Sequence, residues 1–301
     1  MLKRSASLLS VSLNSLQSAS LAVVLFLSLF LLSCAENVEK SAGRFLTAAK
    51  TAFDAGRFDE AKANIDSIKV VCPKAFEARK AGIALLRQVE LAEARRTYAY
   101  TDSLLAVSMA RAEELTAATD GKAPRFTFEK DAQYQDIGRY SAPSQKLEQN
   151  AQRCYLRATV DEHGRMVLTS FWRGAAYIHH HAVKVSAGGT FAQTPVRTDT
   201  YESSDALAKT ERNDFVLGES DGEVIQWIAL HAGEAVKLEY LGDKTYTTTL
   251  PASDTRAIAD VYELAQALQA VHKLSVMRDE TTRRIAFLEK NEQRPATDEQ
   301  P

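Results

Sequence analysis

Three adjacent histidines, His179, His180 and His181, are the residues whose type and spacing most directly suggest chemistry. Neutral imidazole is a common zinc ligand, and side chains two residues apart in a strand share one face about 6.5 Å apart. His179 and His181 could therefore bind one metal ion, with His231, His163 or a carboxylate as the third ligand. Because the sequence has no His-Glu-x-x-His or Cys-x-x-Cys spacing, we expect no metal and no other cofactor, and keep metal binding as an alternative.

Patterns typical of other catalytic sites are absent from the sequence. There is no Gly-x-Ser-x-Gly motif, and Ser170 and Ser186 fall in strand-like segments without a recognisable base partner. No glycine-rich phosphate loop occurs, since Gly188-Gly189 is typical of a turn. We therefore predict a protein that is not an enzyme.

The aromatic residues concentrate between Tyr155 and Tyr246. Neighbouring residues of a strand point to opposite faces, so one of Phe171 and Trp172 should point outward while the other joins the core. An exposed ring of this pair would form a platform that binds a glycan or a peptide. Phe171 and Trp172 are our candidate binding residues.

Alternation of apolar and polar residues predicts a small antiparallel β domain over residues 153–250. Cys154, Leu156, Ala158 and Val160 alternate with polar neighbours, and a turn at 161–164 leads into the next strand. Gly242-Asp243 predicts a second hairpin. One short helix should follow Ser220.

Helical patterns flank this domain. Residues 39–73 predict a helical hairpin broken at Gly56, and 74–119 and 253–291 predict two long amphipathic helices. In the second, apolar residues recur in a near-heptad stripe that includes Ile258, Val261, Leu264 and Leu268. We expect the two helices to pair as an antiparallel, coiled-coil-like stalk. The polar segment 120–152 should be a connector and 292–301 a disordered tail. The fold class is therefore α+β, with the β domain inserted in a helical stalk.

The hairpin resembles one tetratricopeptide unit. The match runs through Phe45, Ala48, Ala49, Ala52, Phe58, Ala61, Ile65 and Pro73. No second copy follows, and a lone repeat cannot bury its own apolar face. The resemblance implies that this face packs on another part of the protein or on a partner.

The first residues have the composition of an export signal. Lys3 and Arg4 precede the apolar run Leu21–Leu32, which is too short to span a bilayer. The run ends in Leu31-Leu32-Ser33-Cys34, which resembles the bacterial lipobox. This resemblance implies that residues 1–33 are a signal peptide and that lipid on Cys34 anchors the mature chain. Ala35, where an aspartate would favour the inner membrane, points to the outer membrane of a Gram-negative cell.

The charge of the chain argues against nucleic acid as a partner, and its cysteines argue against a disulfide bond. The formal net charge of the chain is −2, without the basic domain or stripe typical of nucleic-acid binding. Two cysteines remain beside Cys34, namely Cys72 and Cys154, and they fall in different predicted units. We expect free thiols there, because such pairs seldom meet in bridging geometry.

The layout of the mature part resembles uncharacterised bacterial envelope lipoproteins that place a β domain between helical segments. The resemblance implies no activity. We expect a membrane-tethered protein of the binding or scaffolding type, with an envelope protein or glycan as partner. The alternatives are a metal-binding or metal-dependent hydrolytic protein that uses the histidine cluster, and a spacer that self-associates through its stalk.

Overall fold

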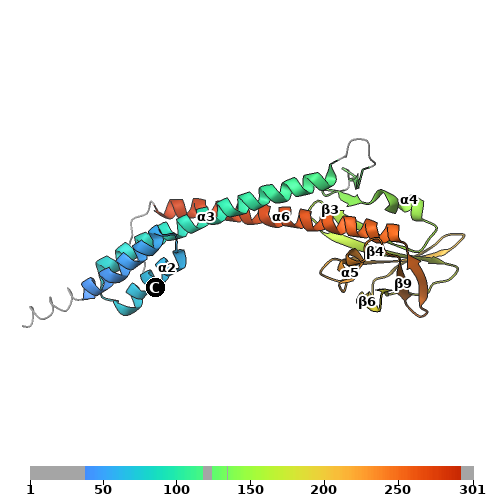
Figure 1. Cartoon of the computed structure of the whole chain (residues 1–301), viewed down its shortest axis with the longest axis horizontal. Helices are drawn as coiled ribbons and strands as arrows, with labels where there is room; N and C mark the ends of the chain where they lie inside the picture. Colours follow the sequence, from blue (N-terminus) through green and yellow to red (C-terminus); the bar gives the residue numbers. More distant parts are fainter. Residues whose placement is uncertain (1–37, 118–123, 134, 293–301) are drawn as a thin grey trace, which may run out of the picture. The chain divides into compact units, whose positions relative to one another are not determined.

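The computed structural model describes residues 38–117, 124–133 and 135–292, so the predicted signal peptide 1–33, Cys34 and the tail after residue 292 lie outside the described residues. The chain divides into two compact units, residues 1–99 with 279–301 and residues 100–278. Two long helices, α3 (Phe76–Thr116) and α6 (Ala252–Glu292), contribute to both units (Figure 1). They contain no proline, and Gly82 is their only glycine, so nothing in either helix interrupts its backbone hydrogen bonds.

The first unit is helical in its described part. A helix over 38–54 turns at Gly56, whose φ of +70° suits glycine, into α2 (Phe58–Val71), which α3 follows. Small side chains let the helices approach: Ala49, Ala52 and Ala61 are completely buried. Leu85 and Val89 of α3 join them and Ile65 in one core cluster. The apolar face of the single tetratricopeptide-like hairpin is thus covered by α3 of the same chain.

The end of α6 completes this unit. Leu288 and Ile285 pack on Leu91 and Ala94 of α3. On the surface, the Arg95 guanidinium lies 2.8 Å from the carboxylate of Glu289. Both contacts join helices that are far apart in the sequence.

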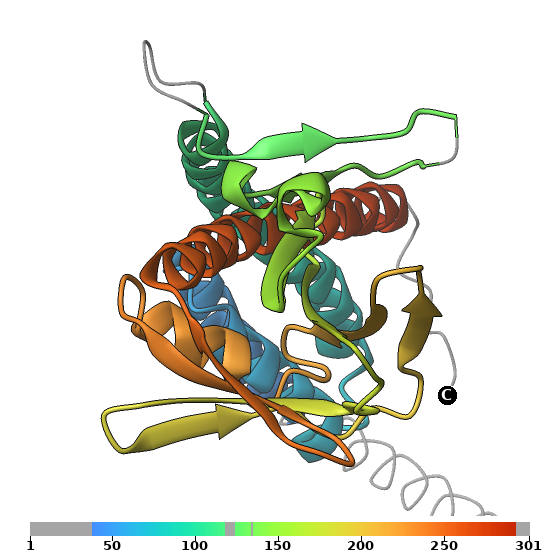
Figure 2. The same ribbon diagram turned by 90° about the vertical axis from the view of Figure 1, so that its right-hand side faces the viewer.

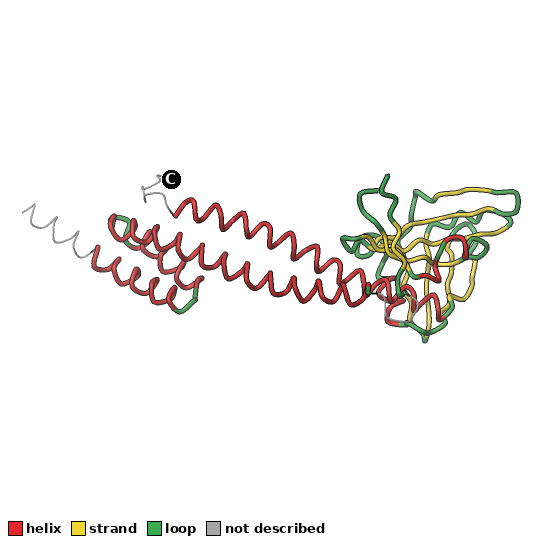
Figure 3. The backbone as a smooth tube through the Cα atoms, turned by 90° about the horizontal axis from the view of Figure 1, so that it is seen from above, coloured by secondary structure: helices red, strands yellow, loops and turns green. Residues whose placement is uncertain are grey.

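The second unit contains all the described strands, in two antiparallel sheets (Figure 3). One sheet has the order β1 (Thr127–Glu129), β2 (Arg139–Ser141), β3 (Tyr155–Asp161), β4 (Met166–Gly174), β8 (Lys209–Val216) and β7 (Tyr201–Ser204). The other has the order β10 (Tyr246–Leu250), β9 (Val236–Leu241), β5 (Ala182–Ala187) and β6 (Thr190–Gln193). A short helix, α5 (Val224–Leu230), packs on β5 and β6 (Figure 2). The α+β class, with a long helix and an inserted β region, is confirmed.

The connector prediction for residues 120–152 is wrong for its described part. This segment contributes β1 and β2 to the six-stranded sheet, followed by a 3₁₀ turn, η1 (Pro143–Gln145), and a single helical turn, α4 (Leu147–Asn150). Three-residue strands are too short for a recognisable alternation. They form because β3 offers its backbone to β2, with Tyr140 opposite Val160.

The core of the second unit lies between the sheets and beneath the start of α6. Leu156, Leu168 and Leu238 from three strands are completely buried there, together with Ile258 and Leu264 of α6. The α6 stripe was expected to pair with the other long helix along its length. Instead its first part packs on the strands, whereas Leu268 is only half-buried at the edge of the same core.

Polar contacts join α3 and α6 in this unit. Thr101 bonds to the sulfur of Met277, and Arg111 bonds to Glu263. Residues later in α3 contact residues earlier in α6, so the two segments run antiparallel.

Cys72 is buried in the first unit and Cys154 is half-buried in the second, and both are free thiols.

Replacement of Leu264 by alanine should lower the free energy of unfolding by about 2–5 kcal/mol, because it leaves a cavity in the shared core. Chemical denaturation monitored by circular dichroism measures the change. Leu207, which is 83% exposed, is the control, and its alanine variant should stay within about 0.5 kcal/mol of the unsubstituted chain. Equal effects of the two substitutions would contradict the position of α6 on the strands.

Candidate functional site

The histidine segment is a loop and not a strand. Residues 178–181 precede β5, and His179 has a φ of +51°, a left-handed conformation that few residues other than glycine adopt. The predicted strand geometry, in which His179 and His181 share a face, is therefore wrong. The middle residue, His180, is the one that points into the protein, and it is completely buried.

His180 connects a serine to a carboxylate. Its Nε2 lies 2.8 Å from Oγ of Ser170 on β4, and its Nδ1 lies 2.7 Å from Oε2 of Glu211 on β8. Glu211 is completely buried as well. Because burial disfavours the charged imidazole, the pKa of His180 is lowered, although Glu211 acts in the opposite direction. Neutral His180 thus donates from Nδ1 to Glu211 and accepts the Ser170 hydroxyl hydrogen at Nε2.

The Glu211 carboxylate also fixes the backbone of the loop. Its Oε1 accepts the N–H groups of Ile178 and His179 at 2.6 and 2.8 Å, and its Oε2 accepts that of His180 at 2.7 Å. Burial alone would raise the pKa of this carboxyl group, but hydrogen bonds from the His180 backbone and ring and from the His179 and Ile178 backbone lower it. A buried carboxylate with four donors is compatible with a stable core.

This serine–histidine–carboxylate arrangement has the connectivity of a hydrolase triad but no access to substrate. Ser170 is completely buried, because it lies on the inward face of β4. The network continues inward to Asn213, whose side chain donates to the His180 carbonyl at 2.7 Å and accepts from Thr200 at 2.8 Å. These hydrogen bonds hold together the segments at the junction of the two sheets. The expectation that Ser170 has no base partner is wrong, whereas its lack of an open site agrees with a structural role.

The metal candidates separate in the structure. Only His179 meets carboxylates: its Nδ1 lies 2.7 Å from Oε1 of Glu202, and Glu211 is close to both. This is the one such group of potential ligands among the described residues, and it excludes His181 and His231. His231 instead stacks on Trp227 of α5 and bonds to its carbonyl oxygen. Since four protein donors already occupy the Glu211 oxygens, a three-ligand cation site would have to break bonds that hold the loop.

The two aromatic candidates point to opposite faces, as alternation requires. Trp172 lies in the core with 5% of its surface exposed, so it is unavailable as a binding platform. Phe171 lies on the outer face of the six-stranded sheet, half-buried, with its ring stacked on Tyr155 at a centroid distance of 4.9 Å. The Arg153 guanidinium covers the Tyr155 ring at 5.0 Å. Of the pair, Phe171 is therefore the one that a ligand can reach.

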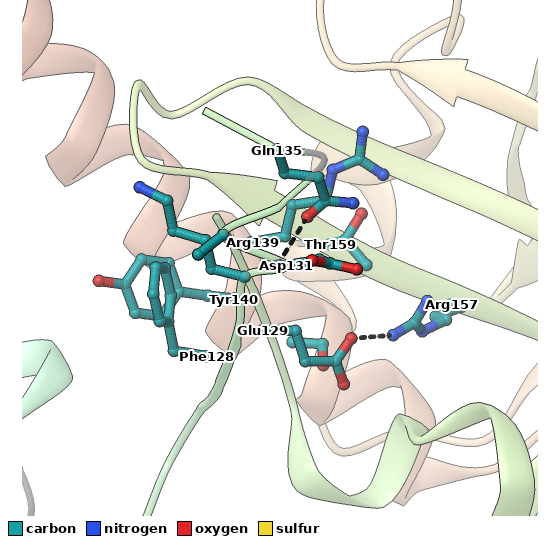
Figure 4. Close-up of a pocket in the computed structure, with 11 residues that line it drawn as sticks. Phe128, Glu129, Asp131, Gln135, Arg139, Tyr140, Arg157 and Thr159 are labelled. Atoms are coloured by element: carbon teal, nitrogen blue, oxygen red, sulfur yellow. Dashed lines mark hydrogen bonds and ion pairs between the residues drawn. The ribbon is translucent and has the colours of Figure 1, made fainter. Parts of the chain in front are cut away.

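The outer face of this sheet also carries a polar groove of about 720 Å³. Arg157 and Thr159 of β3 form part of its floor, while Glu129 and Asp131 at the end of β1 and Arg139 of β2 form its sides (Figure 4). Phe128 and Tyr140 also line the groove, and their rings contact each other at a centroid distance of 4.7 Å. Most of the other lining residues are polar or charged.

Two interactions preorganise the groove floor. The Arg157 guanidinium bonds to the Gln145 carbonyl at 3.2 Å and lies 3.6 Å from the Glu129 carboxylate. The Gln145 side chain pairs with the β3 backbone, donating to the Leu156 carbonyl and accepting from the Ala158 N–H. This carboxamide thus takes the place of a neighbouring strand. Arg157 is held in position before any ligand arrives.

Most of the groove belongs to residues 120–152, whose composition predicts a connector, so the sequence does not indicate the groove. The short groups Thr127-Phe128-Glu129 and Arg139-Tyr140-Ser141 alternate, but over too few residues to indicate strands. Glu211 and Asn213 were detectable in principle. They precede Phe215 at spacings of two, which places polar side chains on an inward face and signals a buried network.

No family model, curated protein or solved structure matches this chain. Among the described residues, no helix combines the length and the apolar character that crossing a membrane requires. The geometry of the sites is therefore the basis for the function proposed below.

The histidines make opposite contributions to the pH dependence of stability. The pKa of buried His180 is lowered in the folded state, so its contribution is present above the unfolded pKa of about 6.5 and is lost as the pH falls. The hydrogen bond to Glu202 raises the pKa of His179, so His179 adds stability as the pH falls toward the unfolded pKa of about 6.5, and this contribution is fully present below that pH.

Denaturation midpoints between pH 7.5 and 5 measure the contributions of His180 and His179 to stability. His180→Asn should reduce the loss of stability on acidification, although the variant is less stable throughout. His179→Gln should make that loss steeper. Parallel curves for the unsubstituted chain and the His180 variant would contradict the buried neutral imidazole.

Proposed function

We propose that this protein is a lipid-anchored, non-enzymatic component of the bacterial cell envelope whose β domain binds an anionic glycan. Lipid on Cys34 provides the anchor, and the ligand lies on the outer face of the six-stranded sheet. The groove beside Arg139 and Arg157 is the observation on which the ligand assignment rests.

The anchor is supported by the sequence. A basic start, an apolar run of signal-peptide length and the residues before Cys34 follow the order of a lipoprotein signal. Several acyl chains on one residue hold a protein firmly, whereas a single chain binds only marginally. The outer membrane is the location that Ala35 favours.

The chemistry of the groove suits a polar, acidic ligand. Three cationic side chains, those of Lys130, Arg139 and Arg157, line it with two carboxylates. Lys130 lies 3.5 Å from the Glu162 carboxylate and Arg157 lies 3.6 Å from that of Glu129, whereas Arg139 forms no ion pair with a described residue. A guanidinium forms paired hydrogen bonds with a carboxylate or phosphate group.

Neutral parts of a glycan find complementary groups on the same face. Sugar hydroxyls can donate to Glu129 and Asp131 and accept from Gln135 and Thr159. Phe171 offers a half-exposed ring to the apolar face of a sugar. It lies two residues beyond Thr169, the residue opposite Arg157, which corresponds to a diagonal separation of about 7–8 Å between Cα atoms.

The closed serine–histidine–glutamate network supports binding without catalysis. Its hydroxyl, imidazole and carboxylate are completely buried. A nucleophile must reach a reacting carbon at about 3–3.5 Å. Binding of a ligand in the groove does not require these three buried groups to be exposed.

Cys34→Ala should block both lipid attachment and signal-peptide removal, so that an unprocessed precursor accumulates. Metabolic labelling with a fatty-acid probe, followed by gel analysis, measures both effects. Cys154→Ala is the matched control and should retain the label. Equal labelling of the Cys34 and Cys154 variants would contradict lipid attachment at Cys34.

Arg139→Ala should weaken binding to purified cell-wall sacculi about tenfold, equivalent to ~1.4 kcal/mol, because a charge-assisted hydrogen bond is lost. Co-sedimentation with increasing amounts of sacculi measures the affinity. Arg165→Ala is the control, since its side chain is 53% exposed and lies in the β3–β4 turn. Binding that is equally strong in both variants, or absent from the unsubstituted protein, would contradict the glycan assignment.

A further inference from the structure

Residues 69–80, which we call the α2–α3 corner, expose three large apolar side chains. Val70 is 77%, Val71 60% and Phe76 61% exposed. Single exposed apolar residues are common on protein surfaces, but a group of them in one turn indicates a contact surface. The corner belongs entirely to the first unit.

The exposure is fixed by the packing of the neighbouring residues. Cys72, Ala75 and Ala78 point inward and form a cluster with Ile68 and Ala42. The inward positions of the turn are thus occupied. Val70, Val71 and Phe76 remain outside because the same turn cannot bury both sets.

Basic residues surround the exposed apolar groups. Lys69, Lys74 and Lys80 are exposed and Arg79 is partly so, whereas Glu77 is the only acid within residues 69–80. The corner therefore carries four cations and one anion. Exposed apolar side chains among lysines are typical of segments that lie in the interface of an anionic membrane, where basic residues are attracted to the lipid phosphates.

The start of the described chain lies at this corner. Val38 packs on the cluster of Cys72 and Ala75, and the Glu39 carboxylate accepts N–H groups at the start of α3, from Glu77 at 3.3 Å and Ala78 at 3.4 Å. Figures 1 and 3 show the beginning of the 38–54 helix beside the connection from α2 to α3. Cys34 precedes Val38 by four residues, which span at most about 14 Å. Lipid on Cys34 is therefore within reach of the corner.

We propose that the α2–α3 corner is a second membrane contact, in which Val70, Val71 and Phe76 enter the boundary between headgroups and acyl chains of an anionic phospholipid bilayer. Lys69, Lys74 and Lys80 then lie at the level of the phosphates. This inference rests on the proposed anchor at Cys34. Two attachment points, the lipid and the corner, would set the orientation of the helical unit on the membrane, which a single lipidated residue leaves free.

A fluorescent probe at the corner tests the contact. The full-length gene is expressed with Val70→Cys, the processed protein is labelled with an environment-sensitive dye, and it is reconstituted into vesicles of phosphatidylglycerol and phosphatidylethanolamine. Asp59→Cys is the matched control on the same helix, because its side chain is 97% exposed and it lies about 16 Å from Val70 along the axis. The chain without either substitution gives the background labelling of Cys72 and Cys154.

The probe at residue 70 should shift to shorter emission wavelength in vesicles and be quenched by spin-labelled lipid, whereas the probe at residue 59 should respond to an aqueous quencher only. Adding Phe76→Ser and Val71→Ser should reduce lipid quenching at residue 70 at least twofold. These exposed substitutions leave the cluster beneath them intact.

Mass spectrometry of the same samples separates the two proposals. Acylated protein with a residue-70 probe that remains open to the aqueous quencher would overturn the corner contact and leave the anchor. Protein that carries no acyl chain and does not join the vesicles would overturn both. An emission shift that already occurs without vesicles would assign the corner to contact between copies of the chain and would likewise overturn the membrane contact.

Discussion

The buried carboxylate of Glu211 is the interaction on which the β domain depends. A charge that is removed from water needs compensating hydrogen bonds, and Glu211 obtains four from residues 178–180. These residues lead directly into β5 of the four-stranded sheet, whereas Glu211 belongs to β8 of the six-stranded sheet. The need to satisfy one carboxylate thus fixes the joint between the two sheets. The left-handed backbone of His179 belongs to this turn, in which successive N–H groups point toward one carboxylate.

The inward position of Ser170 and His180 explains how residues of catalytic type can serve structure alone. Alternation along β4 directs Ser170 into the core and Phe171 to the outer face. The polar network between the sheets is therefore sealed, while the opposite face of the same strands carries the groove. A polar network with every member paired gives a core one defined arrangement, and a partly paired one would destabilise it. The groove differs from this network, because its polar side chains lie on the outer face of the sheet, where a ligand can reach them.

In the helical unit, part of the apolar surface is covered by the same chain and part of it is exposed. The hairpin that resembles a single tetratricopeptide unit needs a partner for its apolar face, and Leu85 and Val89 of α3 provide it. That face is consequently closed to an external peptide. Apolar surface remains at Val70, Val71 and Phe76, at the end where the described chain begins. The proposed membrane contact and the proposed lipid anchor would therefore act at one end of the unit.

Features that depend on local periodicity can be predicted from the residues alone. Long segments almost without glycine or proline predicted α3 and α6, and alternation from Cys154 to Asp161 and from Met166 to Trp172 predicted two strands and their hairpin. It also required one of Phe171 and Trp172 to face outward, because neighbours in a strand alternate whatever the fold. Tertiary structure alone decided which one, since that choice depends on where the second sheet lies. It also decided the partners of His180, which are 10 and 31 residues away in the chain, and the surface on which Leu264 packs. The β1 and β2 strands also depend on tertiary structure, because three residues carry too little pattern to indicate a strand. The pairing of β2 with β3, and of β1 with β2, supplies the hydrogen bonds that define them.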